Sequence, residues 1–239
     1  KSFSDTAMVV ISRVGGEMAD LPTNMDGLNY TENSTEYNDF EPGQHYLSLT
    51  KTEKNMIDMV TKNFANVVLV YNGANTLEMG FVNDYPQIKS VIWCPGTGQT
   101  GFNALGEIVA GEVNPSGHSA DTFVYDLTAA PYFNNIGDFA YTNADSVGYT
   151  VASQAGGDAK LVPPHFVNYV EGIYVGYKFY ETAAAEGLID YDKTVQYPFG
   201  HGLSYTTFTQ KIDSMTEADG TITCLLYTSP SPRDMRRSR

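Results

Sequence analysis

The sequence has 239 residues, with 28 acidic against 14 basic side chains and a formal net charge of −14. Because such an acidic chain repels the phosphate backbone, we exclude nucleic acid as a partner. Hydrophobic residues make up 42% of the chain, which is enough for a folded core, and no run of apolar residues is long enough to predict a membrane span.

Short apolar runs alternate with amphipathic segments in the first half of the chain. Unbroken apolar runs are typical of strands covered on both faces, and a 3.6-residue rhythm is typical of helices. The elements predicted in this way are a strand at 7–11, a long polar loop at 20–46, a helix from 50 to 64, a strand at 67–71, a short helix at 76–79, a strand at 90–93 and a helix at 102–113. This alternation predicts an α/β fold, a mostly parallel sheet flanked by helices in a three-layer sandwich. Ligand sites in such sheets lie beyond the carboxyl ends of the strands.

The first helix has the clearest start signal. Residues 50–53 read T-K-T-E, a capping box in which the first and last side chains satisfy backbone amides at the helix end. The apolar positions predicted to face the core are Met56, Met59, Val60 and Phe64.

The pattern weakens after about residue 128. Residues 114–117 read N-P-S-G and predict a turn. The segment 169–180 is aromatic and apolar, and 207–223 alternates weakly, which predicts the start of a separate β module.

Residues 96–101 read G-T-G-Q-T-G, which matches the dinucleotide-binding pattern G-x-G-x-x-G between a strand and a helix. Glycines there bring backbone amides close to a pyrophosphate at a helix N-terminus. An NAD(P)-binding oxidoreductase domain of the Rossmann type is therefore one hypothesis. Close packing of the helix on the strand explains the same glycines without a nucleotide.

Four blocks, in this order, resemble glycoside hydrolase family 3. The segment 9–20 resembles the strand and S/G-R-x-S/G-G-E-G-x-D motif of that family. The helix and N-P-S-G turn ending at 117, the E-G-I-Y-V-G-Y-K-F-Y segment at 171–180 and the F-G-H-G-L-S-Y-T-T-F segment at 199–208 resemble three further blocks. Met18 departs from the pattern, because the family commonly has glycine at that position.

The resemblance implies a fragment of a retaining, exo-acting β-glucosidase-like hydrolase of terminal β-linked sugars. Glu17 maps onto the acid/base glutamate, and the nucleophilic aspartate belongs to a (β/α) barrel that precedes this domain in the same chain. A retaining glycosidase needs two carboxyls roughly 5–5.5 Å apart, one of them protonated to assist the leaving oxygen. Asp20 and the loop tyrosines Tyr30 and Tyr37 are candidate substrate-binding residues, and Tyr46 is a further candidate for stacking on a sugar. The fragment alone is expected to be inactive.

The predicted organisation is a family 3 C-terminal α/β sandwich domain at 1–206, lacking its N-terminal part, and the start of a fibronectin type III-like domain at 207–223. The basic end of the chain, 224–239, resembles a translated sequencing adapter.

A non-catalytic sugar-binding or scaffold module is the third hypothesis for function. The partners expected are an oligosaccharide or aryl β-glycoside and the barrel domain of the same chain. The four histidines lack the spacing of metal ligands, so neither a metal ion nor a cofactor is expected. Because the sequence does not begin with methionine, the compartment, cytoplasmic or secreted bacterial, stays open.

Overall fold

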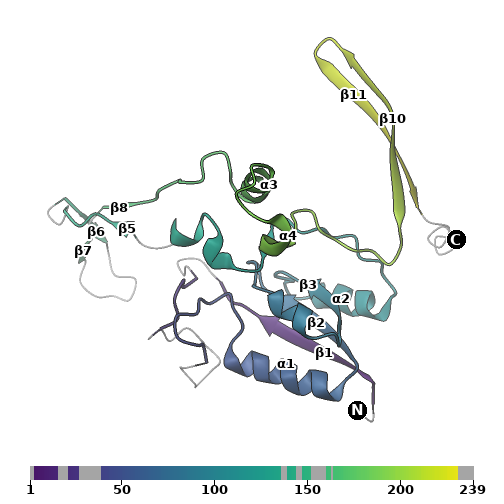
Figure 1. The fold of residues 1–239 in the computed structure, drawn as a ribbon, viewed down its shortest axis with the longest axis horizontal. Coiled ribbons are helices and arrows are strands. Elements are labelled where there is room, and N and C mark those ends of the chain that lie inside the picture. The colour runs from purple at the N-terminus through teal and green to yellow at the C-terminus, as the bar shows by residue number, and fades with distance from the viewer. Residues whose placement is uncertain are drawn as a thin grey trace. The chain divides into compact units, whose positions relative to one another are not determined.

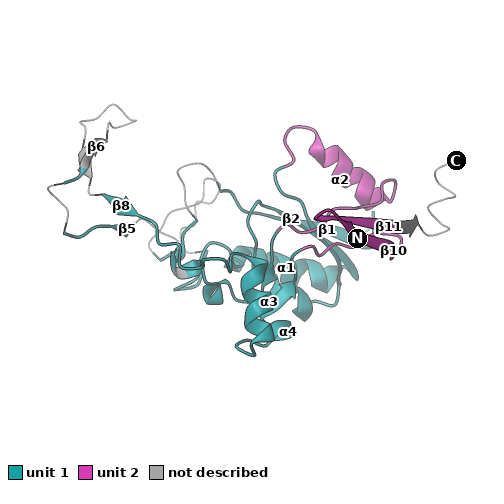
Figure 2. Cartoon of the chain, turned by 90° about the horizontal axis from the view of Figure 1, so that it is seen from above, with its two compact units in different colours: residues 1–96, 121–199 teal, residues 97–120, 200–239 magenta. Residues whose placement is uncertain are grey.

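The computed structural model describes residues 3–15, 21–26, 39–135, 139–143, 147–151, 160–162 and 164–230. Its elements are, in chain order, β1 (Thr6–Ser12), α1 (Lys51–Asn63), β2 (Asn66–Asn72), the short 3-10 helix η1 (Gly80–Asp84), β3 (Ile88–Trp93), α2 (Gly101–Ala110), β4 (Phe123–Val124), η2 (Leu127–Ala129), η3 (Phe133–Asn135), β5 (Phe139–Ala140), β6 (Tyr149–Val151), β7 (Lys160–Val162), β8 (His165–Phe166), α3 (Tyr177–Ala185), α4 (Tyr191–Thr194), β9 (Val195–Tyr197), β10 (Phe208–Ala218) and β11 (Thr221–Pro230). The chain divides into two units, one of residues 1–96 and 121–199 and the other of residues 97–120 and 200–239 (Figure 2). Within the described residues, no helix has the length and apolar character needed to cross a membrane.

The first unit is built on a parallel sheet with the strand order β1-β2-β3 (Figure 1). In its register, Val9 lies beside Leu69 and Ile11 lies beside Tyr71. Alternate side chains of a strand point to the same face, so these four residues share one face, and all four are buried. The predicted α/β fold with a parallel sheet and flanking helices is confirmed.

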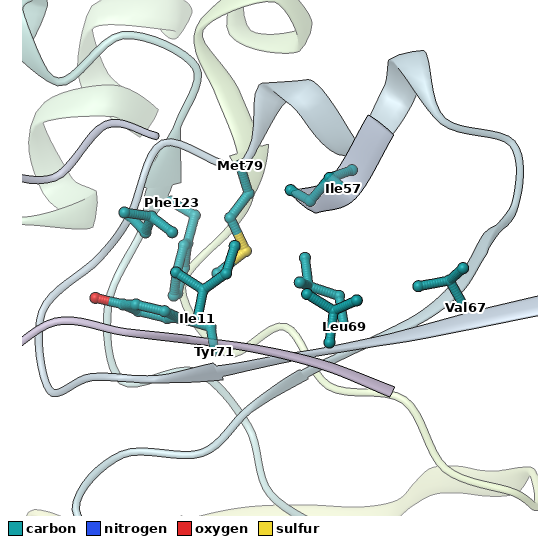
Figure 3. Close-up of a cluster of buried hydrophobic side chains, with 9 residues drawn as sticks. Ile11, Ile57, Val67, Leu69, Tyr71, Met79 and Phe123 are labelled. Carbon is teal, nitrogen blue, oxygen red and sulfur yellow. The ribbon is translucent and has the colours of Figure 1, made fainter. Parts of the chain in front are cut away.

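Helix α1 covers that face of the sheet. The Thr50 hydroxyl accepts from the Glu53 amide while the Glu53 carboxylate accepts from the Thr50 amide, so the predicted capping box is confirmed. Ile57 is 1% exposed and packs into the core near Leu69 (Figure 3). The prediction that Met59 faces the core is wrong, because its side chain is 60% exposed on the outer side of the helix.

The short helix predicted at 76–79 is also wrong, because these residues are not helical and η1 begins only at Gly80. Leu77 and Met79 are both buried, and Glu78 between them accepts a hydrogen bond from the amide of Leu127. Thr76 is buried as well, so these residues form a buried, non-helical connection that leads to η1.

The second unit brings together two blocks that are far apart in the sequence. The Ser204 hydroxyl and the Tyr205 amide both donate to Oδ1 of Asn114, at 3.0 and 2.8 Å. Gly202 lies so close to the carbonyl of Gly117 that a Cβ would sit 2.3 Å from that oxygen. Glycine is therefore required at 202, and the N-P-S-G turn holds the second block in place.

The end of the second unit is an antiparallel hairpin of β10 and β11. Asp219 and Gly220 connect the strands, both with positive φ, as expected for an Asp-Gly hairpin turn. The assignment of 207–223 to a fibronectin-like domain and of 224–239 to adapter stays a prediction.

Candidate active site at the carboxyl edge of the sheet

The four residues predicted to act on a substrate, Glu17, Asp20, Tyr30 and Tyr37, lie outside the described residues. They belong to two segments, 16–20 and 27–38, and the structure describes the residues on both sides of each. The geometry of these flanking residues defines where the two segments begin and end.

Segment 16–20 begins and ends at the carboxyl edge of the sheet. Gly15, shortly after β1, lies beside Leu21, because a Cβ on Gly15 would be 3.6 Å from Cδ2 of the leucine. The same position is 3.2 Å from the side-chain nitrogen of Asn75, which follows β2. The two residues that flank this segment, Gly15 and Leu21, therefore lie side by side near the carboxyl ends of β1 and β2.

Arg13 fixes the chain directly before this segment. Its guanidinium donates to both carboxylate oxygens of Glu53, at 2.5 and 2.7 Å, and to the carbonyls of Ser12, Tyr46 and Ser48 at 2.7–2.9 Å. These contacts use all five N–H donors of the side chain. The side chain is 4% exposed, so this bidentate ion pair is shielded from water. We refer to Arg13, Tyr46, Ser48 and Glu53 as the Arg13 cluster.

The residues that flank segment 27–38 are also held by hydrogen bonds. Before the segment, the Asp26 carboxylate accepts a hydrogen bond from the amide of Gly43, and the amide of Met25 donates to the carbonyl of Gln44. After the segment, the Asp39 carboxylate accepts hydrogen bonds from the hydroxyl and the amide of Thr52, in the first turn of α1.

The hydrogen bonds of Asp39 lower the pKa of its carboxyl. Burial acts to raise the pKa of Asp39, but the hydrogen bonds from Thr52, together with the nearby Lys51 ammonium, bring it below its usual value. The carboxylate of Asp39 is therefore stabilised in its charged form.

Tyr46 is part of the frame and does not present a face to sugar, so the sugar-stacking hypothesis for this residue is wrong. It is 7% exposed, its ring lies 5.4 Å from the Arg13 guanidinium carbon, and its amide donates to the carbonyl of Pro22. Its hydroxyl accepts a hydrogen bond from the amide of Val14 at 3.3 Å. Tyr46 thus connects Arg13 and Val14, through its side chain, with Pro22, through its backbone amide.

Neighbouring strand ends are tied together along the same edge. The side-chain amide of Asn72 donates to the carbonyl of Cys94, and the Trp93 indole donates to the carbonyl of Gly73. Burial raises the pKa of the Cys94 thiol, which makes it a poor nucleophile.

Tyr71 lies at the centre of this edge. A Cβ on Gly73 would be 2.4 Å from its hydroxyl, so only glycine fits there. Burial raises the pKa of Tyr71 to about 12, because the phenolate would be poorly solvated.

The buried His45 connects the chain before α1 with the chain that carries Glu78. Nδ1 of His45 accepts from the amide of Leu47, so the ring proton lies on Nε2 and is donated to Oε1 of Glu78 at 3.0 Å. The same carboxylate oxygen accepts from the amide of Leu127. Within the described residues, no three His, Cys, Asp or Glu side chains form a group that could hold a metal ion.

Sequence reasoning did not identify the Arg13–Glu53 pair or the His45–Glu78 pair. The partners of each pair are 40 and 33 positions apart, so no local spacing connects them. An arginine directly after an apolar strand was the one available signal, since a charge at that place needs a buried partner.

Two of the three glycines at 96–101, Gly98 and Gly101, have local structural reasons. Gly98 has a positive φ of 62°, which favours glycine, and a Cβ on Gly101 would lie 2.9 Å from Cβ of Thr97. These two positions need glycine whether or not a nucleotide is bound.

Comparisons with known proteins agree with the resemblance seen in the sequence. The family model described as "Glycosyl hydrolase family 3 C-terminal domain" matches residues 2–177. The chain is 31% identical over 214 residues to β-glucosidase A of Butyrivibrio fibrisolvens, covering 87% of this chain and 22% of that protein. It is 29% identical over 220 residues to a β-glucosidase of Ruminococcus albus, covering 92% of this chain and 18% of the relative. The chain therefore spans about a fifth of the length of these curated relatives.

Solved structures show the same fold. A β-glucosidase from Paenibacillus barengoltzii matches with a TM-score of 0.62 and 27% identity, over 90% of this chain and 18% of that one. β-Glucosidase 3B from Thermotoga neapolitana, in complex with glycerol, matches with a TM-score of 0.63 and 23% identity, over 96% of this chain and 26% of that one. Since the family model covers well over half of the sequence, the chain belongs to the family of glycosyl hydrolase family 3 C-terminal domains.

Proposed function

We propose that this chain is the part of a retaining, exo-acting β-glucosidase that supplies the catalytic acid/base, and that Glu17 is this residue. The observation that carries the proposal is the position of Gly15 beside Leu21, near the carboxyl ends of β1 and β2, because these two residues flank the segment that contains Glu17. This edge is where parallel α/β sheets bind ligands, and a carboxyl on a short segment between two such residues stays close to it. The names of the relatives support the substrate class, because they are β-glucosidases.

The chemistry divides between two parts of one polypeptide. An aspartate in the preceding barrel attacks the anomeric carbon, while Glu17 gives its proton to the leaving oxygen and then takes a proton from water. Asp20 orders the loop and contacts the substrate, and Tyr30 and Tyr37 stack on sugar rings. No step of this reaction uses a nucleotide, and Gly98 and Gly101 have the local roles described above.

The test uses the full-length protein that carries this chain, with Glu17→Ala. Loss of the acid slows substrates with poor leaving groups most, so we expect kcat/KM for cellobiose to fall roughly 100- to 10,000-fold, the usual contribution of general acid catalysis. A dinitrophenyl β-glucoside needs little protonation, so its glycosylation step is affected far less, and azide should restore turnover by replacing the base-activated water.

Asp84→Ala is the matched control, because Asp84 is an exposed carboxylate at the end of η1. Equal rates of Glu17→Ala and the control on both substrates would disprove the role of Glu17. Glucoside binding without turnover by the unmodified protein would instead favour a non-catalytic module.

A further inference from the structure

We propose that Arg13 is a positioning residue for acid catalysis, which it serves by holding the base of the Glu17 loop against α1. This inference rests on the proposed function of Glu17. It assigns no contact between Arg13 and the substrate, because the guanidinium is buried and all its donors are already used.

The first argument is the position of Arg13 in the chain. It lies between the last residue of β1, Ser12, and Gly15, where the loop begins. Its own amide donates to the carbonyl of Asn72 at 3.2 Å, so its backbone still continues the sheet. The residue that leads into the loop is thus held by the sheet through its backbone and by α1 through its side chain.

The second argument is that the same side chain holds the chain returning from segment 27–38. Its Nε and Nη2 atoms donate to the carbonyls of Tyr46 and Ser48 at 2.8 and 2.7 Å. The amide of Tyr46 in turn donates to the carbonyl of Pro22, directly after the Glu17 loop. One guanidinium therefore holds the chain at Tyr46 and Ser48, and through Tyr46 the chain at Pro22, close to the end of β1.

The third argument is the specificity of the contacts for arginine. The two Nη atoms form parallel hydrogen bonds to the two oxygens of Glu53, a geometry that needs a planar fork. A lysine keeps the charge but has three donors on one nitrogen, so it cannot make the bidentate pair and reach both carbonyls. A glutamine also leaves the Glu53 carboxylate without its cation.

Displacement of the loop base has a specific kinetic effect. Proton transfer requires a heavy-atom distance of about 2.6–3.2 Å, so a shift of about 1 Å in the acid lowers the rate by as much as roughly 100-fold. The loss applies only where the leaving group needs a proton. A purely structural role would instead reduce the fraction of folded enzyme and lower all substrates equally.

The experiment measures kcat/KM of the full-length protein for cellobiose and for a dinitrophenyl β-glucoside, and takes their ratio. We expect Arg13→Gln to lower the cellobiose value roughly 10- to 100-fold and the activated substrate less than about 3-fold. Arg13→Lys should give an intermediate loss. Glu53→Gln keeps a capping side chain for α1 but removes the charge, so it should show the same selective loss, smaller in size.

Tyr85→Phe is the control for stability alone. It removes the 2.6 Å hydrogen bond to Asp58, and Tyr85 lies next to the amino end of β3, away from the loop. A smaller fraction of folded enzyme lowers both kcat/KM values equally and so leaves their ratio unchanged. If Arg13→Gln folds poorly, Arg13→Lys and Glu53→Gln provide the test. An unchanged ratio in the Arg13 and Glu53 variants, with a selective loss in Glu17→Ala, would overturn this inference and leave the proposed function standing. An unchanged ratio in Glu17→Ala would overturn both.

Discussion

Replacing Tyr71 with phenylalanine removes one oxygen atom from the buried end of β2. Tyr71 is 0% exposed, and among the described residues its hydroxyl has no hydrogen-bond partner. A buried polar group without a partner costs about 1–3 kcal/mol, while the ring keeps its packing beside Ile11 and Phe123 (Figure 3). We therefore expect Tyr71→Phe to raise the free energy of unfolding by about 1–2 kcal/mol.

The gain should be larger in alkali. Burial raises the pKa of Tyr71 to about 12 in the folded chain, against about 10 in the unfolded chain. Because the folded pKa is the higher one, the stability that depends on the protonated phenol is complete below about pH 10 and is lost as the pH rises through about 12. Phenylalanine has no such proton, so the variant should lose less stability across this interval.

The assay is urea denaturation of the chain, in which unfolding is monitored through the fluorescence of Trp93, its single tryptophan. The indole reports on the right region, since it donates to the carbonyl of Gly73 and packs edge-on against Phe123 at 5.0 Å. Tyr141→Phe is the control, because that side chain is 47% exposed and should change stability by less than about 0.5 kcal/mol. A loss of about 1 kcal/mol or more in Tyr71→Phe would refute the reasoning, since it would mean that the hydroxyl is paired.

Four further substitutions test the residues around the candidate site, each by urea denaturation. Ile57→Ala removes a side chain that is 1% exposed and should cost about 2–5 kcal/mol, whereas Met59→Ala, 60% exposed, should cost less than about 0.5 kcal/mol. Similar losses for the two would contradict the assigned face of α1. Glu53→Ala leaves a buried guanidinium unpaired and should cost about 3–5 kcal/mol, and an effect below about 1 kcal/mol would mean that water replaces the carboxylate. Asp39→Asn should reduce stability at neutral pH. Because the pKa of Asp39 is lower in the folded chain, its carboxylate stabilises the fold at pH values above the unfolded pKa, and this stability is lost as the carboxyl is protonated. The difference in stability from the parent should therefore vanish as the pH falls below about 4. A difference that persists at low pH would contradict the role of its charge.

Local signals predicted the helices and strands wherever the responsible residues are close in sequence. The capping box at Thr50 and Glu53 satisfies backbone groups within one turn, so it can be read without knowledge of the fold. The assignment of Met59 to the core failed because apolar character alone does not say which of two adjacent stripes of a helix is covered. The error at 76–79 had a readable cause, since Leu77 and Met79 alternate with Thr76 and Glu78 in a period of two.

The site was predictable only in part. The motif at 9–20 placed the loop after a strand, and the structure puts its base at the carboxyl edge of the sheet. The Arg13–Glu53 pair was not predictable, because its partners meet only when β1 and α1 pack together. The Asp-Gly pair at 219–220 did carry a local hairpin signal that the weak alternation of the flanking residues obscured.

The closeness of Gly15 and Leu21 has a consequence for the length of the segment that connects them. A loop whose ends already touch can lengthen cheaply, since doubling its length costs only about 0.6 kcal/mol in closure entropy. The number of residues between Gly15 and Leu21 can therefore change at little cost in stability, while the register of β1 and β2 stays as it is.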